Sequence, residues 1–396
     1  MRPSSNLSAV AIAIAGLLLA GCATVQVSGP GTAEPSAAGE PERAAHWRFD
    51  DATRPPADRD GYRPPQKLAV LLPLTGSLAT AAAPVRDGLL AGYYGERRPR
   101  PEVQFYDTAG TAAGAVAAYT RALSEGADQV LGPLGRDEVE AVFRETQASV
   151  PVLALNRPAS PPPANSASYA LAPEDDGTGA ANYLASRKAL RVLVLSSGDD
   201  GARRSVVAFD KQLQARGGAI VQTLAVTGEK PADMTALLQA AALREGGVDA
   251  VFLALRGPQA HAIAPQLAAA GLGGKPRVAT SQLTSGTGKA EEDRALDGIA
   301  FPTDAWSVTG VSGLPNAAMT GKTLPTARGP AARLFAFGYD AWLLTAYLEK
   351  LALGSDAAVQ GASGTLRIDA DGNVVRTPAW STFSAGYVVP LAGSGG

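Results

Sequence analysis

The chain of 396 residues has few of the side chains on which most catalytic and metal sites depend. It contains one cysteine, Cys22, and two histidines, His46 and His261. A single cysteine excludes an internal disulfide and a cysteine metal cluster. Neither histidine belongs to a Ser-His-Asp order or a metal-ligand spacing, and no pair of carboxylates can be assigned acid and base roles. We therefore expect a protein that is not an enzyme, with no catalytic residues, no metal and no cofactor.

Charge is also scarce, since only 18% of the residues are charged and the 35 basic and 37 acidic residues nearly cancel to a net charge of -2. This balance excludes a basic field for nucleic acid and a polybasic membrane patch. Hydrophobic residues make up 46% of the chain, which is enough for two packed lobes. Binding is therefore expected through shaped surfaces, with no nucleic-acid partner.

The one cysteine ends a short apolar segment at the start of the chain. Residues 7–19 follow Arg2 and contain no charge, but at about 1.5 Å per helical residue they are too short to cross a hydrocarbon core of roughly 30 Å. Such a segment predicts a secretory signal peptide over residues 1–21. The Leu-Ala-Gly-Cys sequence ending at Cys22 resembles the lipobox of bacterial lipoproteins, which implies cleavage before Cys22 and its acylation. An ordinary signal peptide with an incidental cysteine is the alternative.

The residue after the cysteine, Ala23, is not aspartate. By the lipoprotein sorting pattern this implies transfer to the outer membrane, with the lipid-anchored protein facing the periplasm. Residues 23–66 are rich in Pro, Gly, Ala and Ser and have no sustained apolar period, so they cannot bury enough surface to offset their chain entropy. We expect residues 22–66 to form a lipidated tether, in which His46 and Trp47 are either solvated or a small contact motif.

From residue 67 the chain alternates between short apolar runs and helical patterns. The first unit is expected to contain strands at Lys67–Leu72, 103–106, Gln129–Leu131 and 151–155. After a bridging strand at 169–172, a second unit is expected to contain strands at 191–195, 219–226, 248–254 and Arg277–Ala279. Strands separated by helices of ten to fifteen residues predict an α/β fold of two lobes, each a doubly wound parallel sheet with flanking helices.

The last quarter of the chain is expected to be less regular. Residues 306–330 predict an irregular, mobile loop, and residues 331–353 a long helix. Asp-Gly between two β-prone runs predicts a hairpin at 365–376, which we prefer to a calcium loop because the glycine stands at the fourth place and not the sixth. The expected lobes are 67–173 plus 303–353 and 174–302 plus 354–396.

Polar residues and glycines follow several of the predicted strands. The carboxyl ends of parallel strands meet at one edge of a sheet, where such sheets bind ligands. Hydroxyls and backbone N–H groups at strand ends suit a carboxylate or an amide. The alternative, which we favour slightly, is that these turns only close the fold. The candidate cleft residues are Thr75, Gly76, Ser77, Asp107, Gly132, Pro133, Asn156, Arg157, Ser281 and Gln282.

Several segments together resemble type I periplasmic binding proteins, namely residues 67–76 (KLAVLLPLTG), 107–109, 335–343 and 364–369. Within that superfamily the chain is similar to the penicillin-binding protein activator lipoproteins, the LppC-like family, at residues 126–134, 151–158, 249–254, 279–281 and 296–299. The resemblance implies a type I periplasmic binding protein-like fold. It also implies an outer-membrane lipoprotein that activates a class A penicillin-binding protein, which is a peptidoglycan synthase, by direct protein contact.

A second function stays open, that of a substrate-binding lipoprotein for a small amino acid-like or cell-wall-derived ligand of a transporter or sensor. An outer-membrane anchor argues against a transporter receptor, because it would hold the receptor on the wrong side of the periplasm. Longer family members carry an N-terminal helical-repeat domain, and here the Pro-rich stretch precedes the binding-protein-like part. How the partner would be reached without that domain is left open.

Overall fold

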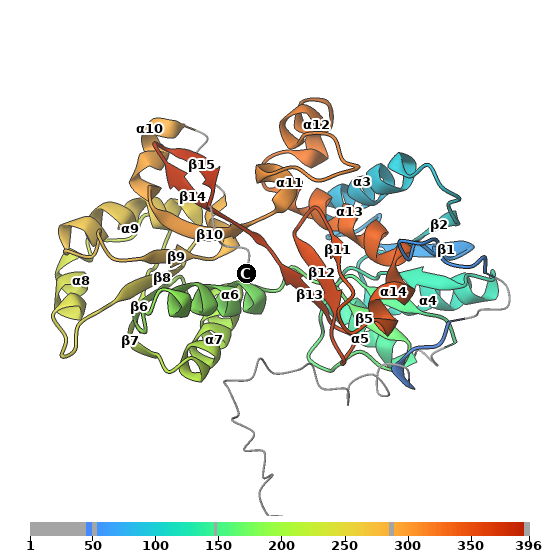
Figure 1. Cartoon of the computed structure of the whole chain (residues 1–396), viewed down its shortest axis with the longest axis horizontal. Helices are drawn as coiled ribbons and strands as arrows, with labels where there is room; N and C mark the ends of the chain where they lie inside the picture. The colour runs from blue at the N-terminus through green and yellow to red at the C-terminus, as the bar shows by residue number, and fades with distance from the viewer. Residues whose placement is uncertain (1–44, 50–53, 146–148, 285–288, 392–396) are drawn as a thin grey trace, which may run out of the picture. The chain divides into compact units, whose positions relative to one another are not determined.

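The computed structural model describes residues 45–49, 54–145, 149–284 and 289–391. Cys22, the expected signal peptide and the first part of the expected tether lie outside these residues. Within the described part, the chain builds two α/β units around two sheets (Figure 1). No helix in these ranges combines the length and the apolar character needed to cross a membrane.

The first sheet has five parallel strands in the order β2-β1-β3-β4-β5. The central strand β1 has five consecutive buried residues, 68–72, which is why its sequence is a continuous apolar run and does not alternate. The strands are β1 (Lys67–Leu72), β2 (Glu102–Asp107), β3 (Gln129–Leu131), β4 (Val152–Ala154) and β5 (Ser166–Ser168).

Helices cover both faces of this sheet. On one face α3 (Ala79–Gly95) packs against α13 (Ala331–Ala346), and on the other α4 (Ala112–Ser124) lies beside α5 (Arg136–Glu145). A separate antiparallel sheet of β11 (Val359–Gln360), β12 (Thr365–Ile368) and β13 (Val374–Thr377) adds Leu366, Ile368 and Val374 to the core on the α3 side. The short helix α14 (Leu348–Leu353) joins the same core.

The second sheet has seven strands in the order β15-β14-β10-β9-β8-β6-β7. Those from β10 to β7 are parallel, and β14 and β15 are added antiparallel at one edge. The strands are β6 (Arg191–Ser196), β7 (Ala219–Ala225), β8 (Ala250–Ala254), β9 (Arg277–Ala279), β10 (Ile299–Thr303), β14 (Ala379–Ser384) and β15 (Tyr387–Pro390).

Helices also cover both faces of the second sheet, as the separate cores on its two sides show. One face carries α6 (Pro173–Ser186) and α7 (Asp200–Ala215), and the other carries α8 (Thr235–Ala242) and α9 (Gly257–Ala269). The shorter helices are η1 (Ser281–Thr284), α10 (Ala290–Asp293), η2 (Arg294–Leu296), α11 (Ala305–Val308), α12 (Ala317–Thr323) and η3 (Pro325–Ala327). The predicted α/β class with two largely parallel, helix-covered sheets is confirmed.

Three local predictions were wrong. The bridging strand expected at 169–172 is instead β5 at Ser166–Ser168, and Tyr169, the residue after it, is buried and donates its hydroxyl to Asp340. The segment 306–330 is not an irregular loop, since it forms α11, α12 and η3 around Trp306, which is 1% exposed. The long helix expected at 331–353 is divided at Tyr347 into α13 and α14.

Two expected boundaries also differ. The tether does not extend to residue 66: Trp47 and Tyr62 are 5% and 4% exposed and belong to the core of the first unit. Of the two interpretations of His46 and Trp47, the small contact motif is therefore the one present, with His46 Nε2 2.8 Å from the Ser166 carbonyl oxygen. In addition, β11–β13 pack in the first unit, so that only β14 and β15 take the C-terminal segment into the second.

Candidate functional site

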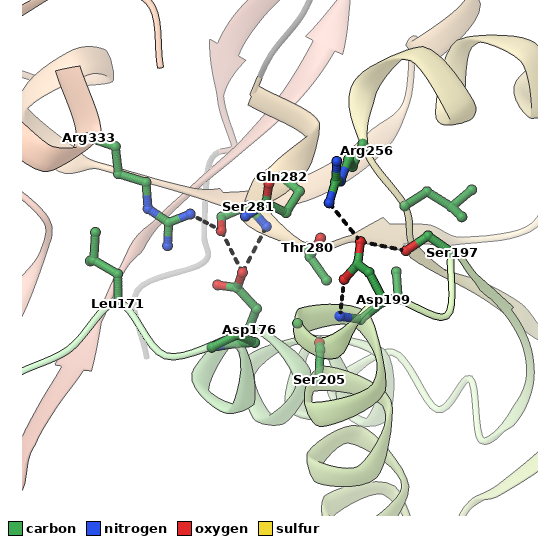
Figure 2. Close-up of a pocket in the computed structure, with 15 residues that line it drawn as sticks. Leu171, Asp176, Ser197, Asp199, Ser205, Arg256, Thr280, Ser281, Gln282 and Arg333 are labelled. Atoms are coloured by element: carbon green, nitrogen blue, oxygen red, sulfur yellow. Dashed lines mark hydrogen bonds and ion pairs between the residues drawn. The ribbon is translucent and has the colours of Figure 1, made fainter. Parts of the chain in front are cut away.

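A cavity of about 380 Å³ opens in the second unit, where the carboxyl ends of β6, β8 and β9 meet the first turns of α6 and α7 (Figure 2). Arg333 reaches it from the first turn of α13. Such a volume lies within the range of small-molecule sites, roughly 300–1,000 Å³. The lining residues are Leu171, Pro173, Asp176, Ser197, Asp199, Gly201, Ala202, Ser205, Ala254, Leu255, Arg256, Thr280, Ser281, Gln282 and Arg333.

One wall of the cavity is built around the Asp199 carboxylate. Asp199 is the N-cap of α7, where its Oδ1 accepts the backbone N–H of Ala202 at 2.9 Å. Its Oδ2 accepts the Ser197 hydroxyl at 3.0 Å and lies 3.2 Å from Arg256 Nη2. These contacts, the capping bond foremost, hold the pKa of Asp199 below its ordinary value. This wall therefore presents an ionised carboxylate beside an exposed guanidinium.

The other wall is built around Asp176 and Ser281. Asp176 Oδ2 accepts the Ser281 backbone N–H at 3.0 Å and the Ser281 hydroxyl at 2.5 Å. Arg333 Nη1 also donates to the Ser281 hydroxyl, so that α6, η1 and α13 are joined at one side chain. Figure 2 shows Arg333 and the Asp199–Arg256 pair on opposite sides of the Asp176–Ser281 pair.

Behind this wall lies a charged cluster at the places where the chain passes between the two sheets. Asp176 follows the passage from β5 to α6, Asp304 follows β10, and Arg376 stands at the end of β13 before β14. Arg376 is 6% exposed, with Nη2 3.9 Å from Asp176 Oδ1. Burial alone would lower the pKa of Arg376, but the Asp304 and Asp176 carboxylates raise it above its ordinary value. The Arg376 guanidinium thus attracts the carboxylates that stand at the other two passages.

Several polar atoms at this site are buried and make no hydrogen bond to any described residue. They are Ser205 Oγ, Asp176 Oδ1, and Nε and Nη2 of Arg376. Buried polar groups normally find partners, and an unpaired one costs about 1–3 kcal/mol. Ser205 and Asp176 line the cavity, whereas Arg376 lies behind its wall, so the unused hydrogen-bonding capacity of the cavity rests on Ser205 Oγ and Asp176 Oδ1.

The structure divides the predicted cleft residues into three sets. Ser281 and Gln282 line the cavity of the second unit. Asn156 and Arg157 line a different hollow of about 210 Å³ next to Leu134 and Phe337, where Arg157 Nη1 is 3.1 Å from Asp175 Oδ1. The other six, Thr75, Gly76, Ser77, Asp107, Gly132 and Pro133, line neither hollow.

The Thr75 and Asp107 turns bind each other instead. The Asp107 carboxylate accepts the Thr75 hydroxyl at 2.6 Å and the backbone N–H groups of Leu74, Thr75 and Ala109 at 2.9, 3.2 and 2.8 Å. These bonds, that of the Thr75 hydroxyl first, hold the pKa of Asp107 below its ordinary value. Four donors therefore already occupy the Asp107 carboxylate. Because the ten predicted residues fall into three sets, the structure does not bring them together in one cleft. For these turns the structure agrees with loop closure.

Sequence reasoning missed most residues of the cavity. Ser197 and Asp199 lie in a polar run directly after a predicted strand, and Arg256 follows another, so the strand-end rule applied to the second unit could have found them. No local signal marks Arg333 or Arg376, which come from a helix start and a hairpin far along the chain.

The groups that line the cavity are of the kinds that bind a small polar molecule. Two carboxylates, two guanidinium groups and four hydroxyls surround a small volume with apolar contributions from Leu171 and Leu255. In the described part of the chain, no group of three or more His, Cys, Asp and Glu side chains is placed to hold a metal ion.

Comparison with known proteins identifies the fold and the relatives. The chain is 27% identical over 340 residues to the penicillin-binding protein activator LpoA of Enterobacter sp. (strain 638), covering 74% of this chain and 45% of that protein. It thus spans about half the length of the curated relatives it matches.

Two solved structures show the same fold. One is the C-domain of LpoA (YraM) from Haemophilus influenzae, described as a regulator of PBP1A, with a TM-score of 0.71 at 22% identity over 82% of this chain and 100% of that one. The other is a putative branched-chain amino acid ABC transporter protein from Chromobacterium violaceum, with a TM-score of 0.63 at 28% identity over 80% of this chain and 99% of that one. The predicted type I periplasmic binding protein-like fold is therefore confirmed.

The family assignment rests on a match that covers most of the folded part. The model described as LppC putative lipoprotein matches residues 62–386, which include the strands β1–β14 of both units. The chain belongs to the LppC lipoprotein family.

Proposed function

We propose that this protein is a lipid-anchored activator of a class A penicillin-binding protein, which it contacts directly from the outer membrane. The observation that carries the proposal is the family match over residues 62–386 together with relatives named penicillin-binding protein activators. The protein acts without catalysing a reaction itself.

The extent of the structural match supports this proposal. The Haemophilus influenzae C-domain is described as a regulator of PBP1A, and its whole length is covered by the alignment. The two units of this chain therefore correspond to the C-domain of that regulator. The partner of this chain would be a peptidoglycan synthase of the same class.

The anchor fits the same function. Acylation of Cys22 gives a stable hold on the membrane when more than one chain is attached, and Ala23 favours the outer membrane. Because Trp47 and Tyr62 pack in the first unit, the tether expected over residues 22–66 does not include this part of the chain. The domain would thus stay closer to the membrane than a tether of full length would allow.

Activation would operate by selection of a conformation. If the protein binds an active arrangement of the synthase more tightly than an inactive one, it shifts the population toward the active arrangement, and the difference in affinity limits the shift. This mechanism needs only complementary surfaces.

Direct contact can be tested with two purified proteins. The immobilised full-length chain should retain a purified class A synthase in a saturable manner, and a penicillin-binding protein of another class should pass through. Retention of neither protein, or of both equally, would argue against the proposal.

A further inference from the structure

The outward side of α8 in the second unit is neutral and largely apolar. Leu237 is 55% exposed and Leu243 is 85% exposed, and Ala236 and Ala240 beside them are also exposed. Residues 235–243 contain no charged side chain. Figure 1 shows α8 at the margin of the second unit. A surface helix normally presents charged and polar residues to water, so this side of α8 lacks the composition of a solvated face.

Four exposed residues form one stripe along this side of the helix. They are separated by four, three and four positions, a spacing that places side chains on the same side of a helix. The stripe consists of Asp233, Leu237, Ala240 and Arg244. A carboxylate thus stands just before the helix and a guanidinium just after it, with the apolar residues between them.

The stripe is complementary to a second copy of itself that runs in the opposite direction. When two copies of α8 lie antiparallel about a twofold axis between positions 238 and 239, Asp233 of one copy is opposite Arg244 of the other. The same arrangement sets Leu237 opposite Ala240, so that a large side chain meets a small one. Each match occurs twice, because a twofold axis repeats every contact.

Both charged ends of the stripe are held in place by neighbouring residues. Asp233 accepts the Thr235 backbone N–H at 2.9 Å, and Thr235, its hydroxyl first, holds the pKa of Asp233 below the ordinary value. Arg244 Nη1 donates to Gln222 Oε1 at 3.0 Å. Gln222 belongs to β7, the edge strand of the seven-stranded sheet. Groups that are already oriented lose less freedom when a contact forms.

We propose that two copies of this chain associate as a weak symmetric dimer through antiparallel α8 helices, with an Asp233–Arg244 pair at each end of the contact. The charges favour a second copy as the occupant, because one stripe supplies both signs at matching positions. A helix of eight residues offers less surface than the roughly 1,200 Å² that stable interfaces bury, so the dimer is weak. This contact is separate from the contact with a synthase, so either proposal can fail alone.

Sedimentation equilibrium on the purified full-length chain, in a density-matched detergent, tests the dimer without any synthase. Between about 10 μM and about 1 mM protein, the average mass should rise from one copy toward two and not beyond, because a twofold contact closes on itself. Leu237→Glu should weaken the association at least about tenfold, since it replaces apolar contacts near the axis with like charges. Val207→Glu is the matched control, because Val207 is 71% exposed on a different helix, α7.

Charge reversal tests the antiparallel arrangement itself. Asp233→Lys and Arg244→Glu, made singly, each set like charges opposite each other at both ends of the contact and should weaken the dimer about tenfold. The double variant restores opposite charges at both ends. Its association should return to within about threefold of that of the unmodified chain, because the two sites act as a pair.

The proposal is overturned if the unmodified chain stays monomeric over the whole range, including the case in which Leu237→Glu weakens binding of a synthase instead. It is equally overturned if the chain dimerises and Leu237→Glu leaves the association unchanged. A double variant that does not recover, although its thermal unfolding matches that of the unmodified chain, overturns the antiparallel pairing of Asp233 with Arg244.

Discussion

At the scale of single residues, the most unusual group is Asp340 in the middle of α13. It is fully buried and accepts the backbone N–H groups of Ala362 at 2.5 Å and Ser363 at 2.8 Å, the Ser363 hydroxyl, and the Tyr169 hydroxyl at 3.1 Å. Burial raises the pKa of Asp340 to about 7, although these donors oppose the shift. The carboxyl thus joins the long helix to the segment before β12.

Asp340→Asn should destabilise the protein, because an amide places N–H groups against donors that need an acceptor. The loss should depend on pH. Since the folded carboxyl keeps its proton up to about pH 7 and the unfolded one only to about 3.8, the unmodified protein loses stability as pH rises through this interval. Urea unfolding should therefore show a penalty about 2 kcal/mol larger at pH 5.5 than at pH 8.

The control for this comparison is Asp371→Asn, an exposed aspartate in the β12–β13 turn. It should change the free energy of unfolding by less than about 0.5 kcal/mol at both pH values. A penalty for Asp340→Asn that is constant with pH, or that grows as pH rises, would contradict this assignment of the buried carboxyl.

At the scale of elements, α3 and α13 approach closely because each has a glycine at the contact. A Cβ added at Gly88 would overlap the Phe335 carbonyl oxygen, and one added at Gly338 would overlap the Val85 carbonyl oxygen. Both obstacles are backbone atoms, which cannot move aside as a flexible side chain could. The helix pair therefore depends on these glycines.

Gly88→Ala should lower the free energy of unfolding by roughly 1–3 kcal/mol, the usual cost of overpacking, despite the better helix propensity of alanine. Gly95→Ala in the same helix is the matched control, since its nearest neighbour is the Gly313 oxygen at 3.5 Å. Chemical unfolding of both variants compares them directly. Equal stability of the two would show that the helices can separate at no cost.

The segment 54–66 is a second element, and Arg98 makes several of the contacts that dock it. Arg98 lies with Cζ 3.7 Å from the centre of the Tyr62 ring, and it donates to Asp60 Oδ2 at 2.9 Å and to the Tyr347 hydroxyl at 3.0 Å. A cation placed over an aromatic ring contributes about 1 kcal/mol. These contacts hold part of what the sequence predicts to be a free tether.

Arg98→Ala should therefore loosen the segment and speed limited tryptic cleavage after Arg59 about fivefold, which corresponds to about 1 kcal/mol of opening free energy. The neighbouring Arg97→Ala is the control, because the Arg97 side chain is exposed. If both variants are cut at the rate of the unmodified protein, the segment is held by other contacts.

Sequence patterns predicted most of the parallel strands and the β12–β13 hairpin, but they did not predict β10, β14 and β15. A strand such as β8, buried on both faces, reads as an uninterrupted apolar run. In contrast, β10 contains Pro302 and β14 contains three serine and threonine residues, so the composition of these segments does not predict a strand in either. Their place in the sheet depends on partners more than 70 residues apart, as in the pairing of Pro302 with Trp380, and local patterns do not contain that information.

At the scale of the whole molecule, the chain passes between its two sheets three times (Figure 1). Asp176, Asp304 and Arg376 lie next to these passages in the sequence. The candidate cavity borders the same cluster through Asp176 and Arg333. The sequence predicted Ser281 and Gln282 as site residues because they follow a strand. It could not predict that Arg333 and Arg376 join them, since only the tertiary fold brings those residues together.

The central claim is that this protein activates a class A penicillin-binding protein by contact. The most direct measurement is the rate at which a purified class A synthase polymerises its lipid-linked substrate while the full-length chain is added in increasing amounts. We predict that the rate rises and saturates near one protein per synthase. A rate that does not change at any ratio, under conditions where the synthase is active alone, would contradict the claim.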